Sequence, residues 1–201
     1  GQKLTVWVDG GVVAGFAQID TDKGSLKAGV QLPPGKHYVV KWATGAWGTG
    51  NTIRVIQSAV ASYKRKMPGG PKVHIGDISK RGGGKFRPHI SHQHGRDVDI
   101  GYVMHPGTRG EHYWQHANEE TFDAEKNWFL VKALIETGDV QQIFMSSRLQ
   151  ALILPLAERE LSPEQLARYF RRANPDPRSP SIIKHWKGHL DHMHVRFRCE
   201  E

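Results

Sequence analysis

Apolar and polar residues alternate along this chain with two different periods, which predicts a mixture of strands and helices. Within residues 1–34, the apolar runs LTVWV and GVVAGFAQI are separated by glycine and aspartate, a pattern typical of two or three β-strands joined by turns. Apolar residues then recur at helical spacing from Ile53 to Tyr63, which predicts a helix over residues 52–66. The prolines and glycine of QLPPGKHYVV lie between these regions and predict a boundary after residue 34.

The rest of the chain contains further signals of the same two kinds. Strands are predicted at PKVHIGDI, RDVDIGYV, VQQIFM and HMHVRFR, and loops at KRGGGKFRP and ANPDPRSPS. Asp123 is placed to cap a helix that ends at Gly138, and another helix is predicted over about 147–159. In SPEQ, Ser162 caps a further helix and Gln165 completes a capping box. Because these elements follow no regular βαβ rhythm, an α+β fold is predicted.

Length and composition indicate one globular domain with an extension. The 201 residues, with 38% hydrophobic and 24% charged positions, are enough for a domain with a real core. We expect a β extension over 1–34 and the main domain over 35–201. No apolar run approaches the roughly 20 residues that cross a bilayer, so no membrane span is expected. The chain opens on Gly1 without a signal-like start, so we interpret its N-terminus as trimmed or processed, with any export signal removed.

Charge and cysteine content narrow the possible chemistry. The formal net charge of +8 favours an anionic partner such as nucleic acid, a membrane surface or a wall polymer. A basic surface kept for solubility is an equally good interpretation. The chain lacks a basic strand with interleaved aromatic residues, which would be the signal for RNA binding. Cys199 is the single cysteine, which excludes an internal disulfide and a cysteine metal site. A bound metal would therefore have nitrogen and oxygen ligands.

Two predicted strands carry ionisable side chains on one face and apolar side chains on the other. In RDVDIGYV, Asp97 and Asp99 share the face opposite the valine and isoleucine. In HMHVRFR, His192, His194 and Arg196 share the face opposite the methionine, valine and phenylalanine. Since apolar side chains go to the core, the two imidazoles point together into a cleft or into solvent.

His92, Asp99 and His194 form a candidate metal site. Catalytic zinc sites use three histidine or carboxylate ligands and keep one position for water. His92 lies seven residues before Asp99, on a glycine-bearing loop. One carboxylate and two neutral imidazoles leave the ion with a charge of about +1, acidic enough to lower the pKa of its water toward about 7.

The spacing of these residues is a weak signal, but the crowding of histidines around them is a stronger one. Histidines cluster at each of the two strands, at positions 89, 92 and 94 and at positions 185, 189, 192 and 194. A histidine-rich surface strand is the alternative, and it would need no aspartate. Other sites lack their motifs: no His-Glu-x-x-His helix, no phosphate-binding loop and no nucleophile elbow is present.

The joint pattern of SHQHGRDVDIGY and GHLDHMHVRFRC resembles the penicillin-insensitive murein endopeptidases. These belong to the wider group of zinc D-peptidases with a His-x6-Asp motif and a terminal His-x-His. The likeness runs from about HYVVKWATGAWGTGN, at residue 37, to Cys199, and it leaves residues 1–34 uncovered. It implies a zinc D-peptidase-like α+β fold, with a mostly antiparallel central sheet and flanking helices.

The resemblance also implies roles for individual residues. One zinc ion would be held by three residues, namely His92, Asp99 and His194. His192 would be the catalytic base, and His189 would line the active site and, if cationic, help to stabilise an oxyanion. His89 would touch substrate or a second metal. Some members have a further carboxylate and histidine for a second metal, whereas TFDAEK here has no histidine at the matching spacing, which argues against a second zinc.

Further side chains are candidates for supporting roles. Asp97 and Asp191 could accept hydrogen bonds from ligand or catalytic imidazoles, although a solvated turn residue is an equally good interpretation of Asp191. Arg148 could pair with a substrate carboxylate, with an ordinary surface arginine as the alternative. Trp186 and Tyr102 could line the cleft, with core packing as the alternative.

The implied function is that of a zinc metallopeptidase acting on peptidoglycan peptides. The resemblance implies hydrolysis of peptide crosslinks, D-alanyl to diaminopimelate, in the periplasm or outside the cell, with no nucleic-acid partner. A wall-binding module that keeps the fold without the reaction is the main alternative, and the intact ligand and base positions argue against it. A metal-dependent phosphoesterase ranks last, because such sites usually need two metals. The choice between endopeptidase and carboxypeptidase, the oligomeric state, the native metal and the role of residues 1–34 stay open.

Overall fold

The N-terminal strands predicted from the sequence pair locally. In the computed structural model, the described residues are 4–8, 11–15, 24–108, 114–174, 176 and 180–199. β1 (Leu4–Val8) and β2 (Gly11–Gly15) form an antiparallel hairpin, and β3 (Val30–Gln31) pairs with β5 (Trp47–Gly48). The end of the predicted GVVAGFAQI strand and part of the ANPDPRSPS loop lie outside the described residues.

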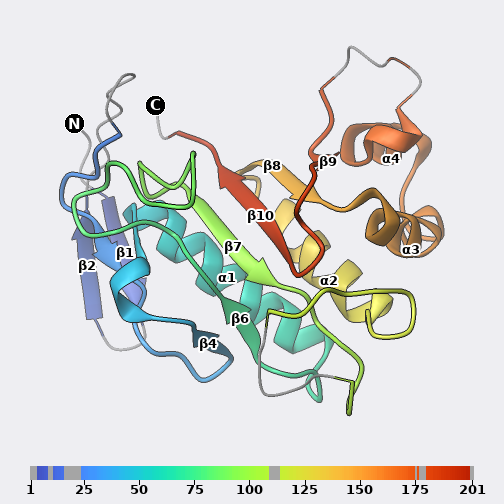
Figure 1. Ribbon diagram of the computed structural model, residues 1–201, viewed down its shortest axis with the longest axis horizontal. Coiled ribbons are helices and arrows are strands. Elements are labelled where there is room, and N and C mark those ends of the chain that lie inside the picture. Colours follow the sequence, from blue (N-terminus) through green and yellow to red (C-terminus); the bar gives the residue numbers. More distant parts are fainter. Residues whose placement is uncertain are drawn as a thin grey trace.

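A six-stranded sheet with the order β4-β6-β7-β10-β8-β9 forms the centre of the molecule (Figure 1). The three inner pairs of neighbouring strands are antiparallel, whereas the outermost pair at each edge is parallel. The predicted α+β fold with a mostly antiparallel sheet is therefore confirmed, with parallel pairs at both edges. The strands of this sheet are β4 (Tyr38–Val40), β6 (Val73–Ile75), β7 (Asp97–Gly101), β10 (His192–Phe197), β8 (Val140–Met145) and β9 (Ile183–His185).

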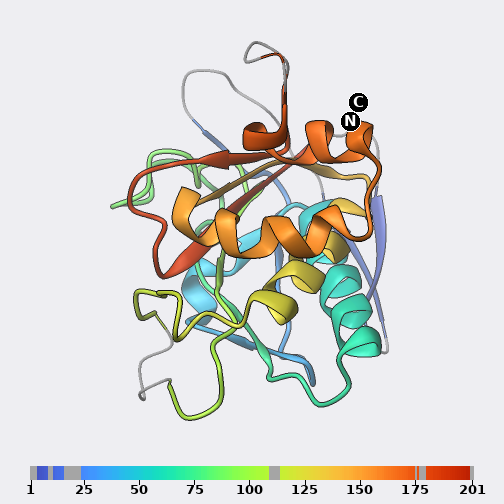
Figure 2. The same ribbon diagram turned by 90° about the vertical axis from the view of Figure 1, so that its right-hand side faces the viewer.

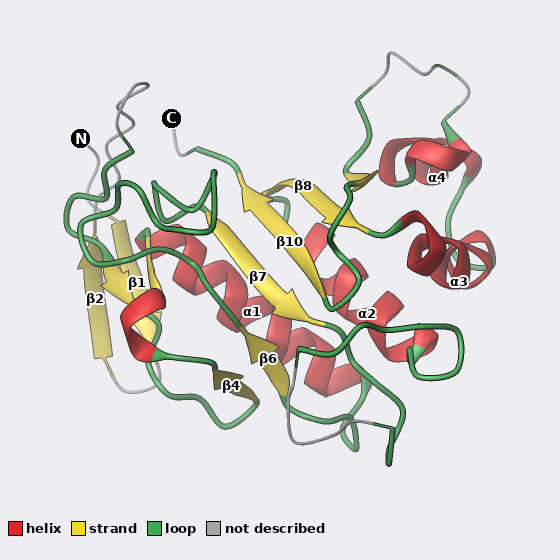
Figure 3. Ribbon diagram, viewed as in Figure 1, coloured by secondary structure: helices red, strands yellow, loops and turns green. Residues whose placement is uncertain are grey.

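Helices α1 and α2 lie behind the sheet in the view of Figure 1, and α3 and α4 lie at the end of the molecule that faces the viewer in Figure 2. Figure 3 shows the same arrangement by type of element, with long loops in front of the sheet. No helix among the described residues is both long and apolar enough to cross a membrane. The helices are α1 (Gly50–Lys66), α2 (Ala124–Ile135), α3 (Ser147–Glu158) and α4 (Pro163–Tyr169), with short 3₁₀ turns η1 (Ala43–Gly45) and η2 (Arg171–Ala173).

Local hydrogen bonds explain why the helix starts were predictable. The Asp123 side chain accepts from the backbone N–H of Lys126 at 3.1 Å and caps α2, as predicted. Ser162 and Gln165 form the predicted capping box of α4. Helix α1 begins two residues earlier than predicted, because Thr49 supplies the cap.

Short strands were harder to predict than helices. The sequence indicated a break at QLPPGKHYVV, yet its end forms β4, which pairs in parallel with β6. Strands of two or three residues carry too little periodicity to be recognised, and only the partner strand defines them. Val30 and Leu32 pack in the same hydrophobic core as Ile53 of α1, and the domain boundary at residue 34 stays a prediction.

Asn127 of α2 fixes the chain where it leaves β7. Its side-chain amide donates to the carbonyls of Val103 at 2.7 Å and Asp123 at 2.8 Å. Its side-chain oxygen accepts from the backbone N–H of Val103 at 3.0 Å, and the residue is fully buried. The three hydrogen bonds satisfy buried backbone groups that no water can reach.

We expect Asn127→Ala to lower the free energy of unfolding by about 2–3 kcal/mol, because it leaves two buried carbonyls and one N–H without this partner. Urea denaturation followed by tryptophan fluorescence measures the change. Gln141→Ala, at an exposed position of β8, is the control and should change the stability by less than about 0.5 kcal/mol. An equal effect of both substitutions would contradict the anchoring role of Asn127.

Candidate metal centre

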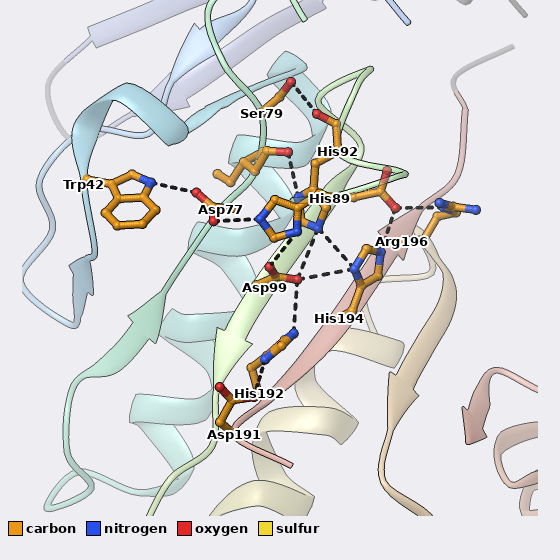
Figure 4. A network of polar contacts seen from close by, with 12 residues as sticks. Trp42, Asp77, Ser79, His89, His92, Asp99, Asp191, His192, His194 and Arg196 are labelled. Atoms are coloured by element: carbon orange, nitrogen blue, oxygen red, sulfur yellow. Dashed lines mark hydrogen bonds and ion pairs between the residues drawn. The ribbon is translucent and has the colours of Figure 1, made fainter. Parts of the chain in front are cut away.

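The pairing of β7 with β10 brings two predicted ligands directly opposite each other. His194 is paired with Asp99, and Arg196 with Asp97, in an antiparallel ladder. The residues between them, including Val98 and Val195, are fully buried in the core. The ionisable side chains therefore stand on the sheet face opposite the core, as the alternation predicted (Figure 4).

Three atoms from His92, Asp99 and His194 converge on one point. His92 Nε2 lies 3.1 Å from His194 Nδ1 and 3.2 Å from Asp99 Oδ1. His194 Nδ1 lies 3.3 Å from the same Asp99 oxygen. A tetrahedral zinc ion with bonds of about 2.0–2.1 Å separates its ligand atoms by about 3.3–3.4 Å. The spacing of the three atoms therefore suits such an ion.

Hydrogen bonds on the far side of each ring fix which nitrogen points inward. His92 Nδ1 lies 3.0 Å from the carbonyl of Ile78, and His194 Nε2 lies 2.9 Å from Asp97 Oδ1. Because these oxygens only accept, each of those ring nitrogens carries the proton. In the neutral rings, the lone pairs of His92 Nε2 and His194 Nδ1 then face each other and Asp99. Three acceptors directed at one point repel one another unless a cation lies between them.

Asp99 contributes the charge of this cluster. The residue is 4% exposed, and its Oδ1 atom is buried with no hydrogen-bond partner among the described residues. Burial raises the pKa of Asp99, but the close imidazoles of His194, His92 and His192 outweigh burial and hold that pKa well below its usual range. A buried, ionised carboxylate oxygen without a donor is what a metal ligand offers.

The pKa of His194 shows how the cluster balances its charge without a metal. Burial lowers this pKa, but Asp97 and Asp99 outweigh burial and raise it from 6.5 to about 9. Without a metal, the proton on His194 supplies positive charge at the position that a cation would occupy. The residues thus fit a bound cation.

His89 approaches the cluster from the other side. Its Nε2 atom lies 2.8 Å from Asp77 Oδ2, and the indole N–H of Trp42 donates to Asp77 Oδ1 at 2.6 Å. Its Nδ1 atom lies 3.7 Å from Asp99 Oδ2. His89, His92 and Asp99 each offer a ligand atom within 4.8 Å of the others, so this set could also hold a metal ion.

His192 lies at the edge of the cluster with one nitrogen free. Its Nδ1 atom lies 2.7 Å from Asp191 Oδ1, which fixes the proton on that atom. Its Nε2 atom lies 3.7 Å from Asp99 Oδ1 and so points at the centre. Asp97 and Asp191 thus occupy the orienting positions expected from the sequence, each beside one imidazole.

His189 stands next to His192, with their ring centroids 4.9 Å apart. Its Nδ1 atom lies 3.3 Å from the carbonyl of Lys187. Burial and the neighbouring His192 lower the pKa of His189. The neutral ring is therefore favoured near pH 7, which opposes the cationic state that oxyanion stabilisation by His189 would require.

A pocket of about 490 Å³ opens beside the five site histidines. Its lining includes the apolar side chains of Ile90, Phe144 and Trp186. Ile90 is 90% exposed and Trp186 is 62% exposed, so two large apolar side chains stand at the surface next to the centre. Such a site can take an extended chain with small apolar groups. The placement of Trp186 agrees with its expected position in the cleft.

Two other candidates lie elsewhere. Arg148 borders a different pocket of about 420 Å³, together with Glu119 and Glu120. Tyr102 is buried in the core, and its hydroxyl donates to the carbonyl of His189 at 3.2 Å. The structure therefore does not bring Arg148 to the histidine cluster, and Tyr102 supports the chain that carries His189 without lining the pocket.

Sequence reasoning missed Asp77, Trp42 and Trp114. Asp77 lies two residues after the end of the VHI strand, so a carboxylate near a strand end was the available signal. The Trp114 ring packs edge-on against His192, with centroids 5.7 Å apart, and no local pattern marks it. These residues reach the site through contacts between distant segments.

Comparisons with known proteins point to one family. A family model described as penicillin-insensitive murein endopeptidase matches residues 19–201. Curated proteins called penicillin-insensitive murein endopeptidase from Salmonella typhimurium, Salmonella enteritidis and Salmonella arizonae are 28% identical over 156 residues. The match covers 69% of this chain and 49% of each relative. The chain thus spans about half the length of the curated relatives it matches.

The metal-free protein should lose stability as the pH rises through the pKa of His194. Its folded-state pKa of about 9 exceeds the ordinary 6.5, so the stabilisation is complete below pH 6.5 and disappears as the pH passes 9. In chelator-treated protein, we expect the free energy of unfolding to fall by about 2–3 kcal/mol across this window. Urea denaturation at successive pH values measures it.

Asp97→Asn should flatten this pH dependence, because it removes a carboxylate that raises the pKa of His194. Glu160→Gln, which removes a carboxylate paired with Lys132 away from the site, is the control and should keep the wild-type slope. Equal slopes for wild type and Asp97→Asn would contradict the assignment.

Proposed function

The chain belongs to the family of penicillin-insensitive murein endopeptidases, and from this premise we propose that it is a zinc-dependent peptidase that cuts the peptide crosslinks of bacterial peptidoglycan. The observation that carries the proposal is the convergence of His92 Nε2, Asp99 Oδ1 and His194 Nδ1 within 3.1–3.3 Å. Two lone pairs and one buried carboxylate oxygen meet there, which is a typical donor set for zinc.

In this proposal His92, Asp99 and His194 hold one zinc ion. Three protein ligands leave a position open for water, as catalytic zinc sites require. When bound, zinc would polarise the scissile carbonyl and make that water acidic. Ile78 and Asp97 keep the two imidazoles in the tautomers that present their lone pairs. Asp77 holds His89 beside the ligands, where its ring contacts the substrate.

His192 serves as the general base and then as the general acid. Its Nε2 atom faces the centre with a lone pair and accepts the proton from the attacking water. Asp191, 2.7 Å from Nδ1, stabilises the imidazolium that results. His192 then returns the proton from Nε2 to the nitrogen of the leaving amine. The leaving group must therefore lie on the His192 side of the scissile bond.

His189 contributes as a neutral ring. Its lowered pKa disfavours the cation, and with Nδ1 directed at the Lys187 carbonyl its Nε2 atom is an acceptor. We assign it to contact with a substrate N–H next to the scissile bond.

The substrate we propose is the D-alanyl–diaminopimelate crosslink. The pocket beside the centre is open at the surface and has an apolar wall, which suits a peptide stem bearing small D-alanyl methyl groups. The net charge of +8 suits an anionic wall polymer. This substrate places the protein in the periplasm or outside the cell.

Loss of the metal ligands should abolish both metal binding and cleavage. We expect His92→Ala and His194→Ala to bind far less zinc than wild type, which should bind one ion per chain by elemental analysis after dialysis. Chelation of wild type should stop release of uncrosslinked products from crosslinked muropeptides, measured by mass spectrometry, and zinc should restore it. Undiminished cleavage after complete metal removal would refute the mechanism.

His192→Ala separates catalysis from metal binding. We expect zinc content to stay at the wild-type level, while kcat on crosslinked muropeptides falls by about 10²- to 10⁴-fold through loss of proton transfer. His105→Ala, at an exposed histidine outside the cluster, should retain activity. Zinc binding by wild type without turnover of any muropeptide would favour a wall-binding module instead.

A further inference from the structure

The order of the strands places Lys41 close to the candidate metal centre. This residue directly follows β4, and its backbone N–H donates to the carbonyl of Ile75, at the end of β6, at 2.8 Å. The next residue, Gly76, donates to the carbonyl of Asp99 on β7 at 2.7 Å. Two successive hydrogen bonds across the sheet thus connect Lys41 to the strand that carries the central carboxylate.

The ammonium group of Lys41 is held between two indole rings. Its Nζ atom lies 4.3 Å from the ring centroid of Trp42 and 4.6 Å from that of Trp114. Each contact is a cation–π interaction, which attracts the charge without using a hydrogen-bond acceptor. The N–H groups of Lys41 therefore stay available to an anion.

Both indoles are themselves fixed next to the site. The Trp42 ring donates its N–H to Asp77, which holds His89 (Figure 4). Trp114 packs over Gly76 so closely that a Cβ atom there would lie 2.5 Å from the indole. On its other side, Trp114 contacts the ring of His192. A continuous row of contacts thus joins Lys41 to the proposed acid and base.

Among the residues that the structure describes, Lys41 is a cation at this edge without an acidic partner. Arg196, a cation that lines the pocket, is paired with Asp97, whose Oδ1 atom lies 2.8 Å from the Arg196 Nε atom. For Lys41, the described residues provide no carboxylate within ion-pair distance, and its contacts are the two aromatic rings. A positive charge that is held in place and has no ion-pair partner can bind an anionic group of a ligand.

We propose that Lys41 is a specificity-determining residue that binds the carboxylate on the leaving-group side of the substrate. The inference rests on the proposed function. In a D-alanyl–diaminopimelate crosslink, the carbon attached to the scissile nitrogen also carries a free carboxylate. Since His192 returns a proton to that nitrogen, the carboxylate next to it lies on the side of Trp114 and Lys41. The apolar part of the pocket lining, which includes Ile90, Phe144 and Trp186, then receives the acyl side.

The test uses two crosslinked peptides that differ only in whether this carboxylate is free or amidated. We expect wild type to prefer the free carboxylate by about 10- to 100-fold in kcat/KM, as for a charge-assisted hydrogen bond. Lys41→Met keeps the apolar stem and should reduce the preference to near one, mainly by raising KM for the free acid. Lys41→Arg should restore much of the preference.

Lys72→Met is the matched control, because it removes one exposed lysine at the opposite end of the β4–β6 pair. It changes the net charge equally and should keep the wild-type preference. A Lys41→Met enzyme that still prefers the free carboxylate, or a wild type without preference, would overturn the inference. A Lys72→Met variant that loses the preference would also overturn it, by showing that general charge attraction is responsible.

Calorimetric binding of both peptides to His192→Ala separates this inference from the proposed function. Turnover by wild type without discrimination in binding would leave the peptidase intact and remove the role of Lys41. Preferential binding of the free acid to His192→Ala, with loss of this preference in the His192→Ala, Lys41→Met double variant, would support the role of Lys41. If no peptide were cleaved in that case, only the proposed function would fail.

Discussion

The antiparallel pairing of β7 with β10 is the constraint on which the site depends. In this register His194 faces Asp99, and Arg196 faces Asp97. A shift of one residue would turn the ionisable side chains of one strand into the core and its apolar side chains outward. The buried Val98 and Val195 on the other face therefore fix the site as firmly as any polar contact, because their burial selects the register. Asn127 stabilises the same region by anchoring the chain where it leaves β7.

Around this pairing, buried carboxylates and imidazoles form a network with a defined direction. Asp97, Asp77 and Asp191 each hold one imidazole by its outer nitrogen, and the inner nitrogens face Asp99 or its neighbours. Burying this much polarity is costly unless each group has a partner. The outer groups have partners in the protein, whereas the inner ones meet only one another. In the proposed metal site, a bound cation would offset the unfavourable free energy of the inner groups, and metal affinity would then be coupled to the stability of the fold.

In our proposal, the surroundings of the centre give a bound peptide an orientation. The pocket lining includes the exposed apolar side chains of Ile90 and Trp186. Trp114 contacts the ring of His192, and the ammonium group of Lys41 lies against Trp114. An apolar acyl portion and an anionic leaving group match this asymmetry in only one direction. Under the proposed mechanism, a peptide oriented in this way would present its leaving nitrogen to His192, so substrate recognition and proton transfer would use the same side of the site.

Features that depend on local backbone geometry could be predicted from the amino-acid sequence. Side chains alternate along any strand, so the polar faces of β7 and β10 and their candidate ligands could be predicted, and the caps at Asp123 and Ser162 follow from hydrogen bonds within one turn. The resemblance to a family grouped these residues into one metal site only as an expectation. Tertiary structure alone decided which strands pair, that Trp42 and Asp77 support His89, and that Arg148 lies at another pocket. Such contacts join segments far apart in the chain, and their geometry exists only after the sheet has assembled.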